Sequence, residues 1–227
     1  MTEAPHLSNE PPQGEASNGD WADRMEQAVL DAAIHHAPAT GWNARMLRAA
    51  CKENALSVGD EELLFPNGAR DLAALLSRRH DDRAMAALAE LDPASLKIRE
   101  RIARAVSARM EAGAADLEAT RRCAAFLALP VNADLGLKLA WETADELWRW
   151  AGDTATDENH YSKRAILSGI LVTCLAIDMA SGREAALAHL DRSIDNVMAF
   201  EKWKAGFKPT EVARDVAGAL SRMRYGR

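Results

Sequence analysis

Aromatic residues are scarce in this chain of 227 residues: they make up 5% of it, and six of the twelve are tryptophan. Cysteine is sparse too, because Cys51, Cys123 and Cys174 lie far apart and form no Cys-x-x-Cys spacing. An odd number of scattered cysteines excludes a disulfide framework and a zinc ribbon, and it is typical of a reducing compartment. The few tryptophans are therefore the first places to look for an interface.

Positive charge is not in excess: 28 Lys and Arg stand against 34 Asp and Glu, a formal net charge of -6. This balance disfavours sequence-independent attraction to nucleic acid. The first twenty residues hold four acidic residues, three prolines and no Lys or Arg, which is unlike a basic targeting segment. The longest charge-free apolar run, 165–177, has 13 residues, whereas roughly 20 span a bilayer. We expect a bacterial cytoplasmic protein with a disordered tail and no transmembrane helix.

The sequence also lacks a sustained alternation of apolar and polar residues, which would indicate β-strands. Every convincing pattern of apolar residues has helical spacing. We predict an all-α chain of about ten helices, with left-handed Gly152 capping the seventh and Thr156 starting the eighth. The eighth helix is apolar on all sides, so we expect other helices to surround it. The expected helices cover 21–36, 43–54, 59–65, 68–89, 94–113, 116–129, 132–150, 157–180, 183–204 and a last stretch from 209.

Three short helices before a long one resemble the architecture of TetR-type regulators, in which a helix-turn-helix, here 43–65, reads DNA. A recognition helix needs cations or amides on its exposed face. Residues 53–69 contain no Lys or Arg and four carboxylates, so we expect a helix-turn-helix remnant that binds no nucleic acid. The expected divisions are a tail (1–20), a head (21–66), a helical lipid-binding body (67–206) and an amphipathic helix (207–227).

Large amphipathic side chains gather around one short loop, at Trp148, Trp150, His160 and Tyr161. Residues of this kind are enriched in protein interfaces, although a plain turn between two helices explains part of the pattern. Because residues two apart point about 200° apart on a helix, one of the two tryptophans is expected in the core. No metal-ligand spacing repeats elsewhere, so we expect no metal, no cofactor and no catalytic residue.

The segment LALPVNADLGLKLAWETADELWRWAGDTATDENHYSKRAIL, above all WRWAGDTATDENHYSKRA at 148–165, resembles the coenzyme Q (ubiquinone) biosynthesis accessory family, often called Coq-nine. The similarity covers about residues 22–225. It implies a TetR-like fold that has lost DNA binding, binds isoprenoid lipid, associates with membranes and supports the di-iron demethoxyubiquinone hydroxylase. It further implies that the hydroxylase binds a surface made of Gly152, Asp153, Thr156, Asp157, His160, Tyr161 and Arg164. We add Trp148 and Trp150 to this surface because of their residue type.

One position departs from the family pattern. Mitochondrial members carry a tryptophan where this chain has His160, which leaves open a different docking mode or another ubiquinone enzyme as partner. The small residues in the eighth helix are compatible with close packing of neighbouring helices and, equally, with a void between them. The resemblance favours the void, as a tunnel for an isoprenoid tail. The expected wall residues of that tunnel are Phe126, Leu129, Leu139, Trp141, Leu171, Cys174 and Leu175.

The last segment combines an apolar stripe with basic residues. Val212, Val216, Leu220 and Met223 recur at helical spacing. Five cations, Arg222 and Arg224 among them, against two carboxylates give a charge of +3 over 208–227. Such a helix suits an anionic membrane surface but equally fits packing on the body or on a second subunit, and the resemblance favours the membrane.

We therefore expect a non-enzymatic lipid-binding accessory protein on the bacterial inner membrane. It would take an isoprenoid ubiquinone precursor from the membrane and present it to the hydroxylase. A homodimer is expected by analogy with TetR-type proteins. The alternative is a TetR-like, ligand-responsive transcription regulator, which the acidic second short helix opposes. An enzyme is a third hypothesis, opposed by the lack of a nucleophile-base pair.

Overall fold

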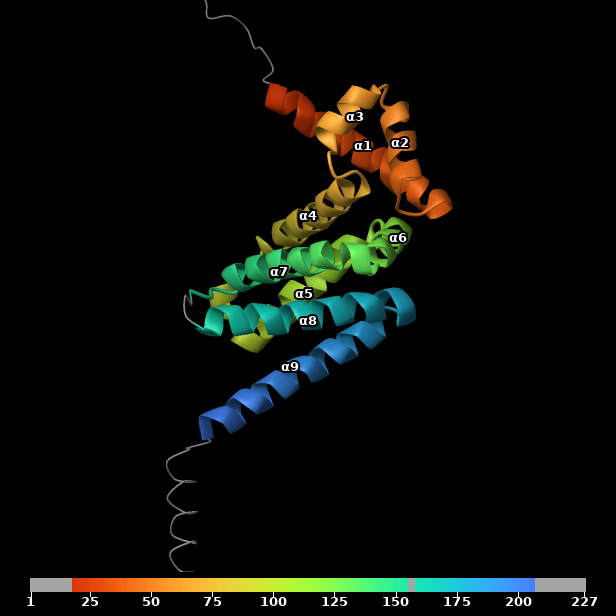
Figure 1. The fold of residues 1–227 in the computed structure, drawn as a ribbon. Coiled ribbons are helices and arrows are strands. Elements are labelled where there is room, and N and C mark those ends of the chain that lie inside the picture. Colours follow the sequence, from red (N-terminus) through yellow and green to blue (C-terminus); the bar gives the residue numbers. More distant parts are fainter. Residues whose placement is uncertain (1–17, 155–157, 207–227) are drawn as a thin grey trace, which may run out of the picture. The chain divides into compact units, whose positions relative to one another are not determined.

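The structure is a computed structural model that describes residues 18–154 and 158–206, and over these residues it is all-α, as predicted (Figure 1). The tenth expected helix lies outside the described residues, and so does the expected tail apart from 18–20, which begin α1. The elements in order are α1 Asn18–Thr40, α2 Ala44–Glu53, α3 Val58–Leu64, α4 Ala69–Leu88, η1 Pro93–Ser95, α5 Ile98–Ala114, α6 Leu117–Leu127, η2 Pro130–Asn132, α7 Ala133–Trp150, α8 Glu158–Ser181 and α9 Arg183–Gly206.

The short helices begin where side chains satisfy the first backbone N–H groups. The Asn43 side chain accepts hydrogen bonds from the backbone N–H of the second and third residues of α2. At α3, the Ser57 hydroxyl accepts from the Asp60 N–H at 3.2 Å, and the Asp60 carboxylate accepts from the Ser57 N–H at 2.9 Å. This is a capping box, so one carboxylate of the acidic α3 has a structural role.

The described residues cluster into two compact units. The first comprises the described residues up to Arg83 together with Ala112–Leu139, and the second comprises Ala84–Glu111 and the described residues from Ala140 onward. Helices α4, α5 and α7 each pass from one unit to the other. A compact unit need not coincide with a functional domain, so the division into head and body, and the likeness to TetR-type regulators, stay predictions.

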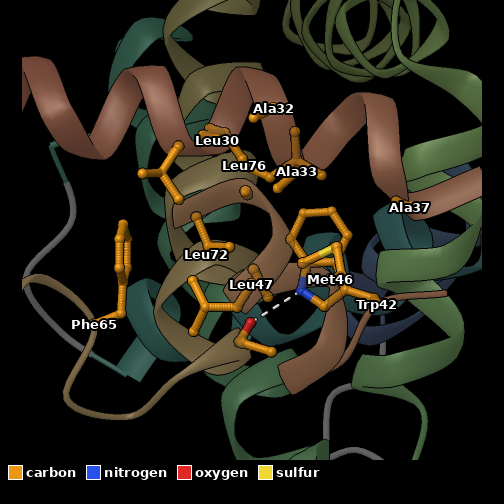
Figure 2. Packing of buried hydrophobic residues seen from close by; sticks show 14 of the residues in the cluster. Leu30, Ala32, Ala33, Ala37, Trp42, Met46, Leu47, Phe65, Leu72 and Leu76 are labelled. Carbon is orange, nitrogen blue, oxygen red and sulfur yellow. Dashed lines mark hydrogen bonds between the residues drawn. The ribbon is translucent and has the colours of Figure 1, made fainter. Parts of the chain in front are cut away.

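The first unit has its core around α1, α2 and α4 (Figure 2). Trp42 is buried there, and its indole N–H donates to the Ala69 carbonyl at 2.9 Å, which satisfies the one polar group of that ring. Met46 and Leu47 from α2 pack with Leu72 from α4. Removing this apolar surface from water supplies most of the stabilisation that holds these short helices together.

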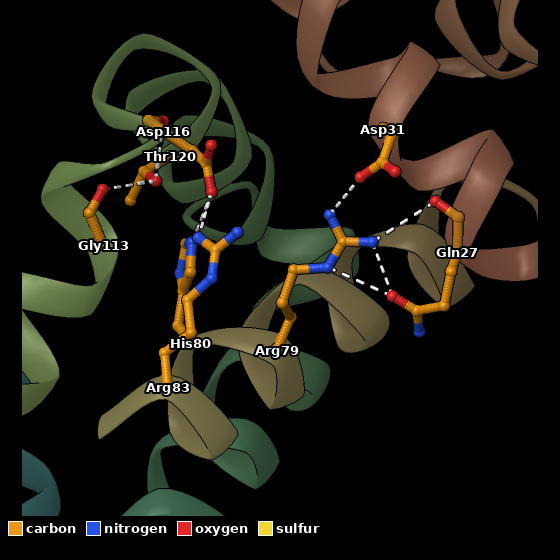
Figure 3. A network of polar contacts seen from close by, with 8 residues as sticks. All are labelled: Gln27, Asp31, Arg79, His80, Arg83, Gly113, Asp116 and Thr120. Atoms are coloured by element: carbon orange, nitrogen blue, oxygen red, sulfur yellow. Dashed lines mark hydrogen bonds and ion pairs between the residues drawn. The ribbon is translucent and has the colours of Figure 1, made fainter. Parts of the chain in front are cut away.

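Ionic contacts fasten α4 within the same unit (Figure 3). The Arg79 guanidinium donates to the Asp31 carboxylate at 2.5 Å and to the Gln27 side chain, both on α1. At the start of α6, Asp116 accepts from Arg83 at 2.6 Å and faces buried His80 at 3.4 Å. Burial acts to raise the pKa of Asp116, but these two partners outweigh it and lower the pKa below its usual value.

In the second unit, α8 corrects the prediction of a helix surrounded on all sides. Leu167, Leu171 and Cys174 are buried in a cluster that includes residues of α9, but the opposite face of α8 is exposed. That face consists mainly of alanine, glycine and threonine, with Ile166 and Val172. Small side chains are apolar on a hydropathy scale yet expose little area, so hydropathy alone did not show which face packs.

The expectation that no helix could span a membrane also needs correction. The part of α8 from His160–Ser181 is long and apolar enough by length and composition, with a mean hydropathy of 1.6, and 28% of the window is buried. A core helix of a soluble protein passes the same test. The buried face of α8 packs against α9, which is what a core helix does.

The core of the first unit can be tested by truncation. Leu72→Ala removes a fully buried side chain and should lower the free energy of unfolding by about 2–5 kcal/mol. Leu63→Ala, at a position 71% exposed on α3, is the matched control and should change it by less than about 0.5 kcal/mol. Urea denaturation followed by circular dichroism measures both, and similar losses for the two variants would contradict this packing.

Candidate functional site at the corner of α7 and α8

The corner begins where α7 ends in a left-handed glycine. Gly152 has φ 87°, its N–H donates to the Arg149 carbonyl at 3.0 Å, and the Asp153 N–H donates to the Trp148 carbonyl at 3.0 Å. This pair of bonds is the Schellman arrangement, which confirms the predicted C-cap. A Cβ at Gly152 would stand 3.2 Å from the Arg101 guanidinium, which donates to the Ala151 carbonyl at 2.7 Å.

A buried arginine joins the two helices of the corner. The Arg164 side chain is 2% exposed, and its guanidinium donates to Asp145 at 2.6 Å and to Asp153 at 2.8 Å. Lys163 donates to the other Asp153 oxygen at 2.5 Å, and Arg149 pairs with Asp145. We call these five residues the ion-pair cluster. Since a buried charge is tolerated only when it is paired and hydrogen-bonded, the cluster fixes how α7 and α8 meet.

The residues of the ion-pair cluster stabilise one another in their ionised forms. Burial acts to raise the pKa of Asp153, but hydrogen bonds from Lys163 and Arg164 and their charges outweigh it and lower the pKa below its ordinary value of 3.8. Burial acts to lower the pKa of Arg164, but hydrogen bonds to Asp153 and Asp145 raise it instead. Both groups are therefore ionised at neutral pH.

The two tryptophans of the corner both pack against the buried cluster of the second unit. The Trp148 indole N–H donates to the Lys163 carbonyl at 3.0 Å, and the Lys163 ammonium lies 5.3 Å from the Trp148 ring centre. The Trp150 indole N–H donates to the Leu88 carbonyl at 3.3 Å. We had expected one of them in the core, and instead both are half-buried with their polar atoms satisfied by the protein.

A second group of aromatic residues lies at the surface. Tyr161 is 64% exposed and is the most exposed aromatic side chain among the described residues. Its ring stacks on Trp141 of α7 with centroids 6.2 Å apart and meets the edge of the His160 ring at 5.2 Å. We call Trp141, His160 and Tyr161 the aromatic corner. A held but exposed aromatic ring is the kind of residue that dominates binding energy in interfaces.

The predicted partner surface is thus divided into two layers. Gly152 and Tyr161 are exposed, whereas Arg164 and the Asp153 carboxylate lie beneath the surface and can only position what lies above them. Thr156 and Asp157 lie outside the described residues. Sequence reasoning missed Asp145, Arg149 and Lys163 as members of the cluster, and it assigned Trp141 to the lipid tunnel.

A signal for the buried charge was present in the sequence. Arg164 precedes Leu167 and Leu171 by three and seven residues, so helical periodicity puts it on their buried side. A cation at such a position requires carboxylate partners nearby.

The predicted lipid-tunnel residues are divided between the two compact units. Leu171 and Cys174 are packed in the core of the second unit, Leu175 is partly buried against it, and Trp141 belongs to the aromatic corner. The first unit holds the other three, Phe126, Leu129 and Leu139. A pocket of about 330 Å³ there includes Leu139, but it is lined mostly by polar and charged side chains and does not suit an isoprenoid tail. The other residues of its lining are Asn67, Arg70, Asp71, Ala74, Arg78, Asp134, Leu135 and Lys138.

Two other expectations concern metals and membranes. Over residues 18–154 and 158–206, no three His, Cys, Asp or Glu side chains cluster so that they could hold a metal ion. The expected membrane residues, Val212, Val216, Leu220, Arg222, Met223 and Arg224, lie outside the described part of the chain.

Comparison with known proteins supports the resemblance drawn from the sequence. The COQ9 family model matches residues 133–201, which include all of α7 and the described part of α8. The chain is 25% identical over 212 residues to the mitochondrial ubiquinone biosynthesis protein COQ9 of Rattus norvegicus, covering 87% of this chain and 68% of the relative. It is 28% identical over 171 residues to that of Xenopus tropicalis and 26% identical over 181 residues to that of Homo sapiens. These matches confirm the resemblance to the coenzyme Q biosynthesis accessory family.

The matches also bear on length and location. They cover 70% and 74% of this chain but only 53% of the Xenopus relative and 57% of the human one, so this chain spans little more than half of those proteins. All three relatives are named as mitochondrial. The comparisons therefore do not support the expected bacterial cytoplasm.

The ion-pair cluster makes a prediction about stability. Arg164→Ala should lower the free energy of unfolding by about 3–5 kcal/mol, because it leaves two carboxylates without their shared buried partner. Lys163→Ala also removes a contact to Asp153, but the Lys163 side chain is 39% exposed, so a loss of about 1 kcal/mol or less is expected. Equal losses in urea denaturation would show that burial of Arg164 does not matter.

The same cluster predicts a pH dependence. Because the pKa of Asp153 is lowered on folding, its stabilisation is complete above the unfolded value of 3.8 and is lost as the pH falls through the lower folded value. The stability difference between the wild type and Asp153→Asn should therefore be constant at neutral pH and shrink below about pH 4. Denaturant titrations at several pH values measure this difference, and one that grows on acidification would have the wrong sign.

Proposed function

Because residues 133–201 match the COQ9 family model, we propose that this protein is a non-enzymatic accessory protein of ubiquinone biosynthesis. It binds an isoprenoid ubiquinone precursor at a membrane surface and presents it to the di-iron demethoxyubiquinone hydroxylase. The observation that carries the proposal is the aromatic corner, which lies within the matched residues and is joined to the ion-pair cluster by a hydrogen bond from Arg164 to the His160 carbonyl at 3.2 Å.

The hydroxylase docks on the aromatic corner in this proposal. Tyr161 and the half-buried Trp141 offer a large apolar area whose rings are already ordered, so little side-chain entropy is lost on binding. Arg164 and its two carboxylate partners hold the start of α8 against the end of α7. His160 meets Tyr161 edge-on, so the histidine takes part in the same surface where mitochondrial family members have tryptophan.

The lipid part of the proposal rests on the similarity to COQ9 proteins and not on a cavity. Burying a polyprenyl tail in protein offsets the cost of lifting it from a bilayer, at roughly 0.8 kcal/mol per CH₂-sized unit. Leu171 and Cys174 are packed against their neighbours, so a tail that entered between α8 and α9 would have to displace them. The basic amphipathic segment 208–227 provides the contact with an anionic membrane, and a homodimer remains part of the proposal.

The alternative function, a TetR-like transcription regulator, has less support. In α3, Val58 and Leu63 are exposed but no cation is present to meet phosphate. Quinone profiling of a deletion strain separates the two: accumulated demethoxyubiquinone supports the accessory role, and unchanged quinones with altered transcripts support the regulator.

Tyr161→Ala should weaken binding of the purified hydroxylase by about 2 kcal/mol, a factor of roughly 30 in the dissociation constant. The free energy of unfolding should change by less than about 0.5 kcal/mol. Leu63→Ala removes a similar exposed apolar side chain from α3 and is the control. Isothermal titration or quantitative pull-down measures the affinity. Undiminished binding by Tyr161→Ala would remove the aromatic corner from the interface.

Native mass spectrometry tests the lipid claim separately. Protein purified without detergent should retain a bound isoprenoid or ubiquinone precursor, because the lipid is buried in the complex and leaves slowly. Empty protein from cells that make ubiquinone would contradict lipid binding without touching the docking of the hydroxylase.

A further inference from the structure

The polar pocket of the first unit has no part in the proposed function. Its volume is about 330 Å³, and its walls are one face of α4 and the first two turns of α7. All of its lining residues, from 67 to 78 and from 134 to 139, belong to the same compact unit. Since ligand sites in proteins measure roughly 300–1,000 Å³, the pocket suits a small molecule rather than a long chain.

A small residue keeps the pocket open. Arg70, Ala74 and Arg78 recur at intervals of four residues, so they form one stripe of α4 with Ala74 in its middle. The Cα of each arginine lies about 6 Å along the helix axis from that of Ala74. Alanine has no atoms beyond Cβ, so the space above it stays free between the two arginines. Lys138 borders the same pocket from α7, and a molecule bound there meets cations from two helices.

The lining has a surplus of positive charge. Arg70, Arg78 and Lys138 stand against Asp71 and Asp134, three minus two, or +1, in a chain with a formal net charge of -6. A concave site with a surplus of one charge raises the local concentration of ions of the other sign. The pocket therefore favours an anion over a metal cation.

Protein donors already engage both carboxylates of the lining. Asp134 accepts from the Arg70 guanidinium at 2.8 Å, and this hydrogen bond lowers the pKa of Asp134 below its usual value. Asp71 accepts from the backbone N–H of Asn67 at 2.7 Å and from its side-chain amide at 3.1 Å. Because these donors partly compensate the negative charge, the two carboxylates repel an incoming anion less than free ones would.

The three cations differ in how they are held. Nη1 of Arg70 donates to the Val131 carbonyl at 2.8 Å and to the side-chain oxygen of buried Asn132 at 3.0 Å, so Arg70 forms a fixed wall. Arg78 and Lys138 are exposed, so their long side chains can turn toward a ligand.

One carboxylate outside the lining competes for Arg78. Burial raises the pKa of Glu26 on α1, the charges of Asp23 and Asp71 raise it further, and the charge of Arg78 acts to lower it. An anion in the pocket has to share Arg78 with Glu26. We therefore expect a dissociation constant of about 0.1–1 mM rather than a tighter one.

We propose that the polar pocket binds a phosphate or diphosphate group that lies above Ala74 and accepts hydrogen bonds from Arg78 and Lys138. A phosphate presents oxygens in several directions, so donors from two helices reach it together. The guanidinium of Arg78 can bind two of these oxygens at once, and the ammonium of Lys138 acts as a point charge. The group belongs either to a free phosphorylated molecule or to the headgroup of a phospholipid.

Titration of the full-length protein with inorganic diphosphate tests the pocket. Isothermal titration calorimetry at low salt should show binding in the expected range. Lys138→Gln removes one of the two exposed cations and should weaken binding by about fivefold or more. Lys52→Gln makes the same change of charge at an exposed lysine of α2 outside the lining, and it should leave the affinity within about twofold of the wild type.

Ala74→Leu fills the pocket without changing any charge. It should abolish measurable binding of diphosphate, and urea denaturation checks that the variant remains folded. Lys138→Gln changes an exposed residue, so it tests the proposal even if Ala74→Leu fails to fold. No binding by the wild type, equal affinities of Lys138→Gln and Lys52→Gln, or full binding by folded Ala74→Leu would each overturn the proposal.

Vesicles distinguish the two sources of phosphate. If the ligand is a phospholipid headgroup, Lys138→Gln should bind phosphatidylcholine vesicles that contain phosphatidic acid less well than Lys52→Gln does. If the ligand is a free phosphorylated molecule, the two variants should bind these vesicles equally. The aromatic corner belongs to the other compact unit, so failure of this proposal would leave the proposed function untouched.

Discussion

The arrangement of α7 and α8 depends on a single buried cation. Arg164, 2% exposed, lies between the carboxylates of Asp145 and Asp153, one from the body of α7 and one from the loop that follows it. A guanidinium without such partners would be very costly to bury, so the helices can meet only where the carboxylates reach it. Tryptophan N–H groups that donate to backbone carbonyls, at Trp148 and Trp150, add further constraints at the same place.

This constraint separates positioning from recognition. Arg164 and Asp153 are buried and paired with each other, whereas Tyr161 is aromatic and exposed to a partner. An interface built on a held ring binds with little loss of side-chain entropy.

Much of the fold could be predicted from the sequence, because its helix ends have clear local causes. Gly152 and Gly182 take left-handed conformations at the ends of α7 and α8, and Ser57 with Asp60 starts α3. The candidate site was predicted as a region but not as a structure: periodicity could have placed Arg164 inside, whereas its pairing with Asp145 depends on how α7 packs. The exposed face of α8 and the burial of Leu171 in a packed cluster depend on packing between helices, which composition does not reveal.

The affinity of Arg164→Lys for the purified hydroxylase tests this arrangement most directly. Lysine keeps the charge but cannot donate to two carboxylates in the fixed geometry of a guanidinium, and at position 164 it cannot itself touch a partner. If the ion-pair cluster positions the aromatic corner, binding should weaken by about tenfold while the protein remains helical and folded. Unchanged affinity in a folded variant would contradict that role and leave the cluster as a contributor to stability alone.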